Sequence, residues 1–428
     1  MPDLSKLTLL IVDSGYFTFV ATEMARYYGK VLYCRPTISV FLESRQHSIG
    51  KGLPGVEWVD ELEPSLDRAD IILFCDVNFG PLQVWLQGKG YRVCGALGGE
   101  KMEQDKYFAL GRLASAGLNI PKSWAFVPQN GKAGLDSAWT FLSDKHEKLW
   151  IKPADKYRGD IDTTAHYHPR QTEIDFNAIR QQIGIVRAQE VGVIVQKDIP
   201  DAIEIGPDLF RNGAEISSTF SIGVEDKGMG YLGRKFSEPP PIMKDFFDKT
   251  ATIYGEVGYQ GPYSSEMRIT PDGKVFALDE CCRMGNPPTA GLIKFYGKDY
   301  ALAVYDCAHG ITPVIDSKNT HFGEIILRCD KYNGRDIYVP VPPELRDWLM
   351  LKNARQDGEE TYCVENGTYG QFASIIATGN SIKEVAGLLD ERVQRMTMPR
   401  LEYLSDYLGV MLKKVAKAKE YAGIDLNG

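Results

Sequence analysis

The chain has 428 residues, of which 43% are apolar and 25% charged, and its formal net charge is −8. This length suits two to four packed units, and the composition is ordinary for a soluble globular protein. The acidic balance argues against a general nucleic-acid binder. The sequence has no run of eighteen or more apolar residues, so we expect no membrane-spanning segment.

The cysteines and the N-terminus indicate the compartment. Eight cysteines are scattered along the chain apart from the adjacent Cys281 and Cys282, and none forms a C-x-x-C pair. We therefore expect no disulfide framework and no structural zinc site, which favours a reducing cytoplasm. The apolar run over 7–13 is short and has no small-residue cleavage site after it, which predicts a first strand and not a signal peptide.

Short apolar runs alternate with helical patterns in the first part of the chain. The runs predict strands at 7–13, 30–33, 70–75 and 91–94. This alternation is typical of an open α/β sheet with right-handed crossovers. One amphipathic helix is predicted over 102–117, where Gly117 ends it.

From Trp124 onward the chain is rich in predicted strands. A small α+β unit is expected over about 122–200, with helical spacing around 171–188. Strands predicted at 216–224, 263–270 and 274–279 indicate an antiparallel sheet, because Pro271-Asp272-Gly273 is a turn sequence. The remaining predictions are a strand at 371–377 and helices at 382–396 and about 398–420.

Two carboxylates flank the predicted turn at 271–273. Glu266 lies on one strand and Asp279 on the next, so both side chains can point to one face of the hairpin. Carboxylates placed so can hold Mg²⁺ and bridge it to ATP phosphates. Arg283 follows, where it can steady a transferred phosphoryl group. The alternative is a solvated hairpin face.

Two lysines and one apolar strand add to this pattern. Lys152 closes the run KLWIKP, and a lysine at a buried strand end is unusual unless it has a partner such as phosphate. Lys106 lies in the helix ahead of it. The strand at 193–199 can present its backbone to an adenine edge, and Glu204 can accept hydrogen bonds from ribose hydroxyls. The simpler reading is a strand-end lysine in water, an ordinary core strand and a surface glutamate.

In this order the residues resemble the site of ATP-grasp enzymes, and more narrowly of glycinamide ribonucleotide synthetase (phosphoribosylamine–glycine ligase). The resemblance extends from about residue 7 to about 396. The segments that carry it are DIILFCDVNFGPL, MEQDKYFALGRLASAGLNIP, LWIKPADKYRGD, GVEDKGMGYLG, GYQGPYSSEMRITPDGKVFALDECCRMGNPPT and IIATGNSIKEVAGLLDERVQRM.

The resemblance implies a mixed α/β and α+β chain with the ATP-grasp fold. Its units would be an N-terminal open parallel-sheet domain at 1–100, a linker helix and small lid at 101–200, an antiparallel-sheet catalytic part at 201–325, and a C-terminal α+β domain with a terminal helix at 326–428.

The resemblance also implies the chemistry: ATP phosphorylates a carboxylate, and an amine then attacks the acyl phosphate. Arg283 and Lys152 would be catalytic, and Glu266 and Asp279 would hold Mg²⁺. ATP would contact Lys106, Lys152, Lys156, Arg158, Gln196, Lys197, Ile199 and Glu204. The substrates would contact Ser14, Gly15, Asp76, Gly228, Met229, Gly230, Asn286 and Thr289.

Several positions depart from that family's pattern. Cys281 stands where a metal-binding asparagine is expected, and thiolate is a soft, poor ligand for Mg²⁺; Glu280 is an alternative ligand. The turns that would bind phosphoribosylamine are altered, at Asp13-Ser14-Gly15-Tyr16, Cys75-Asp76-Val77 and Gly285-Asn286-Pro287-Pro288. These changes indicate a ligase that joins an amino acid such as glycine, or another small carboxylate, to a different acceptor.

Other functions stay open at this point. A non-catalytic ATP-binding relative is favoured by Cys281, and a nucleic-acid-modifying enzyme is disfavoured by charge, although a nucleotide acceptor is compatible with it. A dinucleotide enzyme would need more than the single Gly15 after the first strand. A nucleophilic role for Cys281 or Cys282 has no histidine tied to it. We expect small-molecule substrates, no membrane partner, and a monomer or homodimer.

Overall fold

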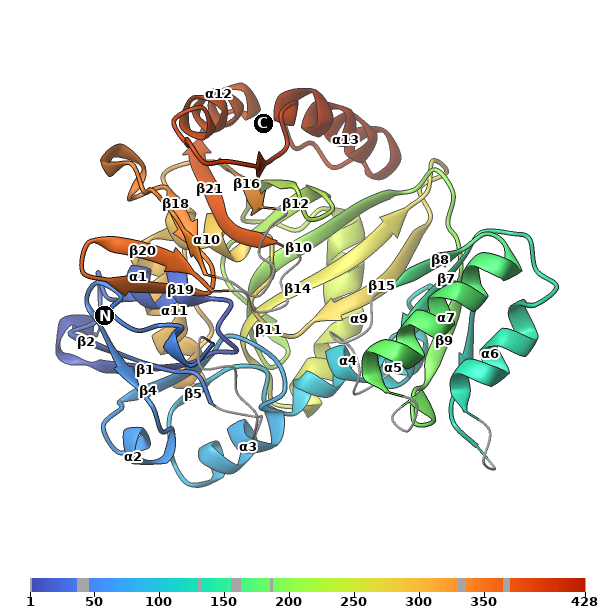
Figure 1. Cartoon of the computed structure of the whole chain (residues 1–428), viewed down its shortest axis with the longest axis horizontal. Coiled ribbons are helices and arrows are strands. Elements are labelled where there is room, and N and C mark those ends of the chain that lie inside the picture. Colours follow the sequence, from blue (N-terminus) through green and yellow to red (C-terminus); the bar gives the residue numbers. More distant parts are fainter. Residues whose placement is uncertain are drawn as a thin grey trace.

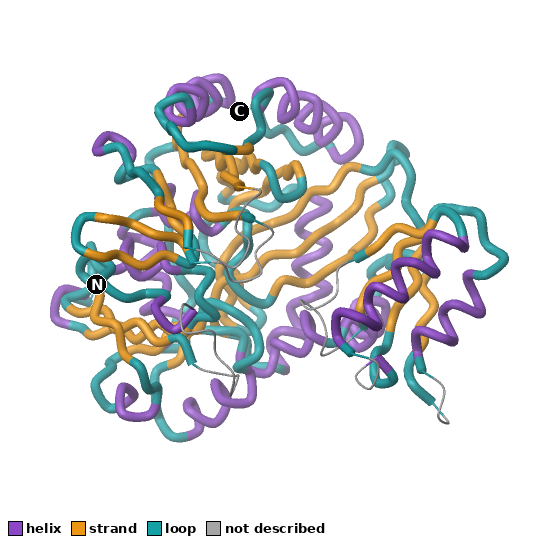
Figure 2. The backbone as a smooth tube through the Cα atoms, viewed as in Figure 1, coloured by secondary structure: helices purple, strands orange, loops and turns teal. Residues whose placement is uncertain are grey.

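The computed structural model describes residues 2–36, 46–129, 133–154, 163–184, 188–329, 336–364 and 370–427. Three large sheets organise it, as Figures 1 and 2 show. The predicted Lys156 and Arg158 fall outside the described residues.

The first sheet is parallel and has five strands in the order β3-β2-β1-β4-β5. In β1, Leu9 and Ile11 pack toward the helices α10 and α11, and Leu10 and Val12 pack on the opposite face. Both faces are covered, which explains the unbroken apolar run. The strands are β1 (Thr8–Val12), β2 (Lys30–Cys34), β3 (Val56–Val59), β4 (Ile71–Phe74) and β5 (Val93–Cys94); the helices are η1 (Leu4–Lys6), α1 (Thr18–Met24), η2 (Gln46–Ser48), α2 (Glu63–Leu66), α3 (Gly80–Gly88) and η3 (Leu97–Glu100).

The second sheet has four strands in the order β6-β9-β7-β8 and forms a small separate unit at the right of Figure 1. It has a core of its own, to which both of its helices contribute. We refer to it as the small unit. Its elements are β6 (Ser123–Phe126), α6 (Gly134–Leu142), β7 (Leu149–Pro153), β8 (Thr164–His166), α7 (Pro169–Ile183) and β9 (Val193–Lys197).

The third sheet has ten strands, and all of its pairings are antiparallel. It extends through both the third and the fourth predicted units. Its strands are β10 (Ile203–Asn212), β11 (Glu215–Ile216), β12 (Phe220–Asp226), β13 (Gly230–Phe236), β14 (Gln260–Ile269), β15 (Val275–Cys281), β16 (His321–Cys329), β18 (Leu349–Leu351), β21 (Gln371–Gly379) and β22 (Leu401–Glu402).

Helices and a small ribbon surround this sheet. α12 packs on β16 and β21, and α13 packs on β10, β12 and β13; both helices lie at the top of Figure 1. A three-stranded ribbon in the order β17-β20-β19 lies beside the parallel sheet. These elements are α9 (Pro241–Glu256), α10 (Thr289–Tyr296), α11 (Lys298–Ala308), β17 (Ile337–Tyr338), η4 (Pro343–Leu345), β19 (Ala354–Asp357), β20 (Glu360–Cys363), α12 (Ile382–Val393) and α13 (Tyr407–Ala422).

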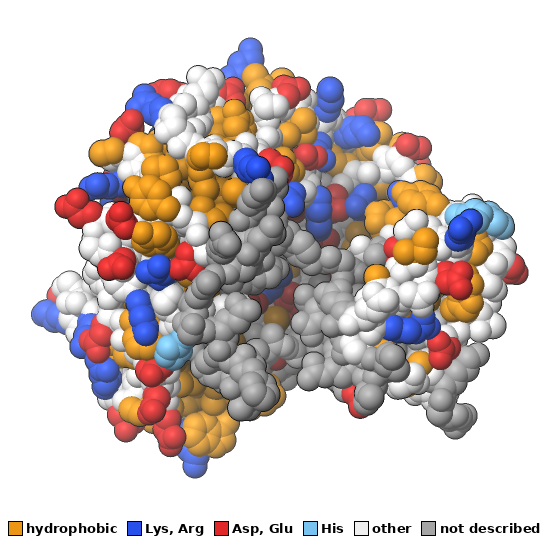
Figure 3. Space-filling view, viewed as in Figure 1, with side chains coloured by type: hydrophobic (Ala, Val, Ile, Leu, Met, Phe, Trp, Pro, Cys, Tyr) orange, Lys and Arg blue, Asp and Glu red, His pale blue; other side chains and the backbone are white. Residues whose placement is uncertain are grey.

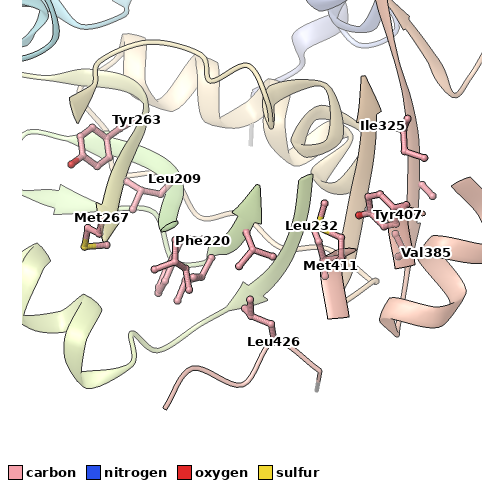
Figure 4. Packing of buried hydrophobic residues seen from close by; sticks show 14 of the residues in the cluster. Leu209, Phe220, Leu232, Tyr263, Met267, Ile325, Val385, Tyr407, Met411 and Leu426 are labelled. Atoms are coloured by element: carbon pink, nitrogen blue, oxygen red, sulfur yellow. The ribbon is translucent and has the colours of Figure 1, made fainter. Parts of the chain in front are cut away.

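Strict alternation along the central strands separates a core face from a polar face. In β12, Phe220, Ile222 and Val224 enter the largest hydrophobic core, whereas Ser221 and Glu225 point the other way. Figure 4 shows this core, to which α12 and α13 contribute Val385, Tyr407 and Met411. The polar face is therefore free to carry chemistry.

Two predicted helices differ from the structure. The predicted 102–117 helix is two helices, α4 (Lys101–Gln104) and α5 (Lys106–Ser115), because Asp105 is extended and caps α5 by accepting from Phe108 N. The predicted 398–420 helix begins only at Tyr407, where Asp406 is the N-cap, and Leu401 lies in a short strand instead. In the described part of the chain, no helix combines the length and apolarity needed to cross a bilayer.

Candidate active site

Glu266 and Asp279 lie directly opposite each other on the polar face. The β14–β15 register pairs them, as the sequence predicts. Asp279 Oδ2 accepts from Lys152 Nζ at 3.0 Å, and its Oδ1 forms an ion pair with Lys106. The predicted metal carboxylates and phosphate lysines thus converge on one cluster.

The two lysines reach Asp279 from different elements. Lys106 is the first residue of α5, and its N–H donates to Ala154 O at 2.8 Å, just beyond β7, which carries Lys152. Their side chains are only 6% and 9% exposed. Buried ammonium groups need partners of opposite charge, and Asp279 is that partner for both lysines.

A third lysine, which the sequence did not single out, belongs to this cluster. Lys227 lies in the turn between β12 and β13, and its Nζ is 2.9 Å from Glu266 Oε1 and 3.5 Å from Glu204 Oε1. Arg268 pairs with the other oxygen of Glu204. The segment GVEDKGMG contains Lys227, but the resemblance assigns a substrate role only to Gly228-Met229-Gly230.

These charges shift the acid strengths of their neighbours. Burial acts to raise the pKa of Glu266, but the positive charges of Lys227, Lys152 and Lys106 outweigh it and lower the pKa to about 2. Glu225 behaves differently, because burial, with Glu266 and Glu204 nearby, raises its pKa to about 8 even against the attraction of Lys227. Glu266 is therefore ionised at neutral pH.

Arg283 is held from two sides. Its Nε donates to Glu103 Oε1 at 3.0 Å and lies 3.7 Å from Asp76 Oδ1. Glu103 also accepts from Cys282 N at 2.7 Å, which fixes the chain after β15. The guanidinium is thus oriented by the helix α4 and by the end of the parallel sheet.

A cavity of about 350 Å³ lies between the small unit and the polar face. The predicted Lys152, Gln196, Lys197, Ile199 and Glu204 all line it. The lining residues that sequence reasoning missed include Leu278 and Trp150, whose Nε1 donates to Asp198 at 2.7 Å. We call this the outer cavity; Figure 3 shows acidic and basic side chains close together in the hollow between the small unit and the body.

A second cavity of about 110 Å³ lies next to the outer cavity on the same face, and we call it the inner cavity. Arg283, Asn286, Asp208 and Glu225 are among its lining residues. Asp208 is 5% exposed, and burial raises its pKa to about 7. Glu204, Lys227 and Glu266 line both cavities, so these three side chains form the wall between them.

The donor set suits Mg²⁺ through carboxylate oxygens only. Glu266 and Asp279 are hard ligands on facing strands, whereas Cys281, next on the same face, is soft. Glu280, the alternative ligand, points into the core and accepts from Tyr263 and Ser265 at 2.5 and 2.9 Å and from Tyr254; that interpretation is wrong. Among the described residues, no group of three or more His, Cys, Asp and Glu side chains forms a metal-binding set.

The predicted substrate residues fall into three places: the carboxyl ends of β1 and β4, the segment at 286–289, and the β12–β13 turn. Ser14 and Asp76, at the carboxyl ends of β1 and β4, share a hydrogen bond of 2.7 Å, and Gly15 adopts a φ of 113° beside them. Thr289 is buried at the start of α10 and lines a small cavity next to Arg283.

Asn286 is tied into a polar network that joins distant segments. Its amide donates to Gln371 Oε1 at 3.0 Å and to Tyr16, and its oxygen accepts from Lys352 Nζ at 2.6 Å. Burial lowers the pKa of Lys352 to about 8. The loop that follows Arg283 is therefore fixed by the N-terminal and C-terminal parts of the chain together.

The predicted loop Gly228-Met229-Gly230 closes the β12–β13 turn. Gly228 has a φ of 66°, and its N–H donates to Glu225 Oε1 at 3.1 Å. Met229 Sδ accepts from Arg328 at 3.9 Å, and its carbonyl accepts from Ile326 N. The loop supports Lys227 and Glu225, which line the inner cavity.

Solved structures resemble this arrangement over nearly its whole length. The phosphoribosylamine–glycine ligase of Thermotoga maritima matches with a TM-score of 0.68 at 15% identity, covering 94% of this chain and 100% of that one. The chain has the ATP-grasp fold. The biotin carboxylase domain of the Hydrogenobacter thermophilus 2-oxoglutarate carboxylase, solved with MgADP and bicarbonate, matches with a TM-score of 0.66 at 10% identity, covering 95% of this chain and 94% of that one.

A third similar ATP-grasp structure is the ADP complex of N5-carboxyaminoimidazole synthetase from Staphylococcus aureus, with a TM-score of 0.61 and 12% identity over 90% of this chain and 97% of that one. No protein-family model matches the sequence, and no curated protein matches it either. At such identities the likeness establishes the ATP-grasp fold and leaves the reaction to be argued from the site.

Proposed function

We propose that this chain is an ATP-dependent ligase that converts a small carboxylate into an acyl phosphate and passes the acyl group to an amine or another nucleophile. The observation that carries the proposal is the shared wall: Glu204, Lys227 and Glu266 separate the outer cavity from the inner one. A phosphoryl group that leaves a nucleotide in the outer cavity would need to cross only this wall.

The outer cavity suits the nucleotide. Trp150 and Leu278 offer apolar surface for a base, and the backbone of β9 beyond Gln196 offers hydrogen-bonding groups. Lys106 and Lys152 are placed for the phosphates, and Glu204 for ribose hydroxyls. Two of the three similar structures named above were solved with ADP or MgADP.

Glu266 and Asp279 would hold Mg²⁺, which, when bound, would neutralise charge on the phosphates. The chain's own contribution is positioning, which dominates catalysis of phosphoryl transfer. Arg283, fixed by Glu103 and Asp76, would hold the carboxylate and stabilise the charge that develops when an amine attacks the acyl phosphate.

The inner cavity favours a small zwitterion as the carboxylate substrate. Its volume of about 110 Å³ admits only a few heavy atoms. Arg283 can pair with a carboxylate, and Asp208 and Glu225 can accept hydrogen bonds from an ammonium group, whose positive charge would favour their ionised forms. An amino acid such as glycine meets both requirements.

The acceptor would approach from the carboxyl ends of the parallel strands, where α/β sheets bind their ligands. Ser14 and Asp76 lie there beside Arg283. A carboxylate in this place suits an acceptor amine or polyol better than an anionic phosphosugar. We therefore propose an acceptor other than phosphoribosylamine.

The location, the division into units and the oligomeric state concern the whole protein. None of the eight cysteines forms a disulfide, which supports a cytoplasmic location. The four-unit division at 1–100, 101–200, 201–325 and 326–428 and a monomeric or homodimeric state remain proposals.

The test is Mg²⁺-dependent nucleotide turnover by the purified chain with pooled amino acids, amines and phosphosugars. We expect ADP and phosphate only when a carboxylate is present, and loss of about 100-fold or more in Glu266→Gln. The matched control Glu238→Gln, in an exposed loop, should keep full activity. ADP that stabilises the protein without any turnover would instead support a non-catalytic binder, the alternative that Cys281 favours.

A further inference from the structure

The backbone around Lys227 is held by hydrogen bonds, whereas its side chain is largely exposed. Its turn is held by Met229 N, which donates to Asp226 O at 2.9 Å, and by the bond from Gly228 N to Glu225. The Lys227 side chain is 68% exposed. Its stem is therefore not packed in place, unlike those of Lys106 and Lys152.

Three positive charges serve separate parts of the polar face. Lys152 lines the outer cavity and pairs with Asp279. Arg283 lines the inner cavity and is held by Glu103. Among the described residues, Lys227 alone of the lysines and arginines lines both cavities.

The wall that Lys227 completes is otherwise acidic. Glu204 and Glu266 both face its ammonium group, at 3.5 and 2.9 Å. A phosphoryl group that crosses between two carboxylates would be repelled by their charge. A cation at this point removes that barrier, and a long flexible side chain can exchange a carboxylate for a phosphoryl oxygen.

We propose that Lys227 is a catalytic residue that contacts the phosphoryl group during its transfer from the outer to the inner cavity. This inference rests on the proposed function. In the step, the bond from the γ-phosphorus to the β,γ-bridging oxygen breaks, and its electron pair leaves with ADP. A carboxylate oxygen of the substrate forms the new bond to phosphorus. No proton changes hands, and Lys227 remains an ammonium group throughout.

The experiment compares Lys227→Met and Lys227→Arg with the wild-type chain under conditions in which the wild type forms ADP. For Lys227→Met we expect kcat to fall by about 100-fold or more, as for loss of one group that stabilises transition-state charge. Lys227→Arg should recover much of this loss. Lys274→Met, an exposed lysine beside the β14–β15 turn, is the matched control and should leave kcat unchanged.

A binding measurement separates catalysis from folding and from nucleotide affinity. In Lys227→Met, ADP should raise the melting temperature as it does in the wild type, because no γ-phosphate is involved. The β,γ-imido analogue of ATP should bind about tenfold more weakly, for one lost charge-assisted hydrogen bond. This pair of results would support contact with the transferred group.

Three results would overturn the proposal. The first is a kcat in Lys227→Met within threefold of the wild type. The second is an equal loss of ADP and analogue binding, which would make Lys227 part of the general nucleotide site. The third is a loss that Lys227→Arg does not restore although it melts like the wild type. A wild-type chain that forms no ADP would instead refute the proposed ligase itself.

Discussion

The active-site carboxylates each have a lysine partner before any substrate arrives. Asp279 pairs with Lys106 and Lys152, and Glu266 with Lys227. Against the effect of burial, the positive charges of Lys227, Lys152 and Lys106 lower the pKa of Glu266 to about 2, so this carboxylate is ionised. In the proposed function, the lysines would exchange these carboxylates for nucleotide phosphates, and the carboxylates would exchange the lysines for a divalent cation. Each group would thereby keep a partner of opposite charge.

Asp13 gives a prediction about stability and pH. It is fully buried, and burial, with Asp76 nearby, raises its pKa to about 7 despite the hydrogen bond from Tyr33. Between the ordinary pKa of 3.8 and about 7, the folded chain keeps a proton that the unfolded chain loses. Asp13 therefore lowers stability as the pH rises through this window, by at most about 1.4 kcal/mol per unit.

In Asp13→Asn this contribution should vanish, so the difference in unfolding free energy between variant and wild type should grow in the variant's favour from pH 4 to 7. Denaturant titrations at several pH values measure it. Asp245→Asn, at an exposed helix position, should run parallel to the wild type. Parallel curves for Asp13→Asn would show that Asp13 is ionised throughout.

At the residue scale, what the sequence could predict depended on distance along the chain. Glu266 and Asp279 were found because they flank one turn sequence, although a β-bulge between Glu266 and Met267 also sets the register that pairs them. Lys227 was not, since its partners lie 23 and 39 residues away and nothing local indicates them. Glu280 was assigned to the wrong role for a related reason: its tyrosine partners come from another helix and another strand.

Among the elements, the break between α4 and α5 matters most for the site. Asp105 caps α5 and so places Lys106 at its first turn, next to the end of β7. The apolar spacing over 102–117 continues across the break, and so predicts one helix. The local signal for a new helix start is Asp105, because aspartate favours the N-cap position. Asp406 gave the same signal ahead of α13.

Asp105→Ala should therefore affect stability and nucleotide binding together. Loss of the cap costs about 1 kcal/mol, and the frayed first turn would release Lys106, so ADP affinity should fall several-fold. Ser381→Ala removes the N-cap of α12, far from the site, and is the matched control. It should cost similar stability and leave ADP affinity unchanged. Equal ADP affinity in both variants would contradict the link between the cap and Lys106.

At the scale of the whole molecule, the sequence predicts the classes of sheet well and their extent poorly. Alternating runs indicated the parallel sheet, and the turn at 271–273 indicated an antiparallel one. No local pattern indicates that β16, β18 and β21 continue the sheet of β10 to β15, because strands that pair over long separations carry no local mark of their partners. On the side opposite the largest core, Phe322 of β16 and Ile376 of β21 pack with α10 in a second hydrophobic core, so the polar face lies on the part of the sheet formed by β10, β12, β14 and β15.

Three sheets surround one polar face, and each would serve a different part of the proposed reaction. The small unit supplies the outer cavity, the ten-stranded sheet the carboxylates, and the parallel sheet the side from which an acceptor would enter. A carboxylate held in the inner cavity would receive a phosphoryl group and then lose it to a nucleophile. This order of events can be tested without knowing the natural acceptor.

The most direct measurement supplies the purified chain with Mg²⁺, ATP, pooled small carboxylates and hydroxylamine, a nucleophile that traps acyl phosphates as hydroxamates. The account predicts a carboxylate-dependent hydroxamate formed in equal amount with ADP and phosphate, and its loss in Asp279→Asn. Hydroxamate formed together with AMP and pyrophosphate, or ADP formed at a rate that no carboxylate changes, would contradict the acyl-phosphate mechanism.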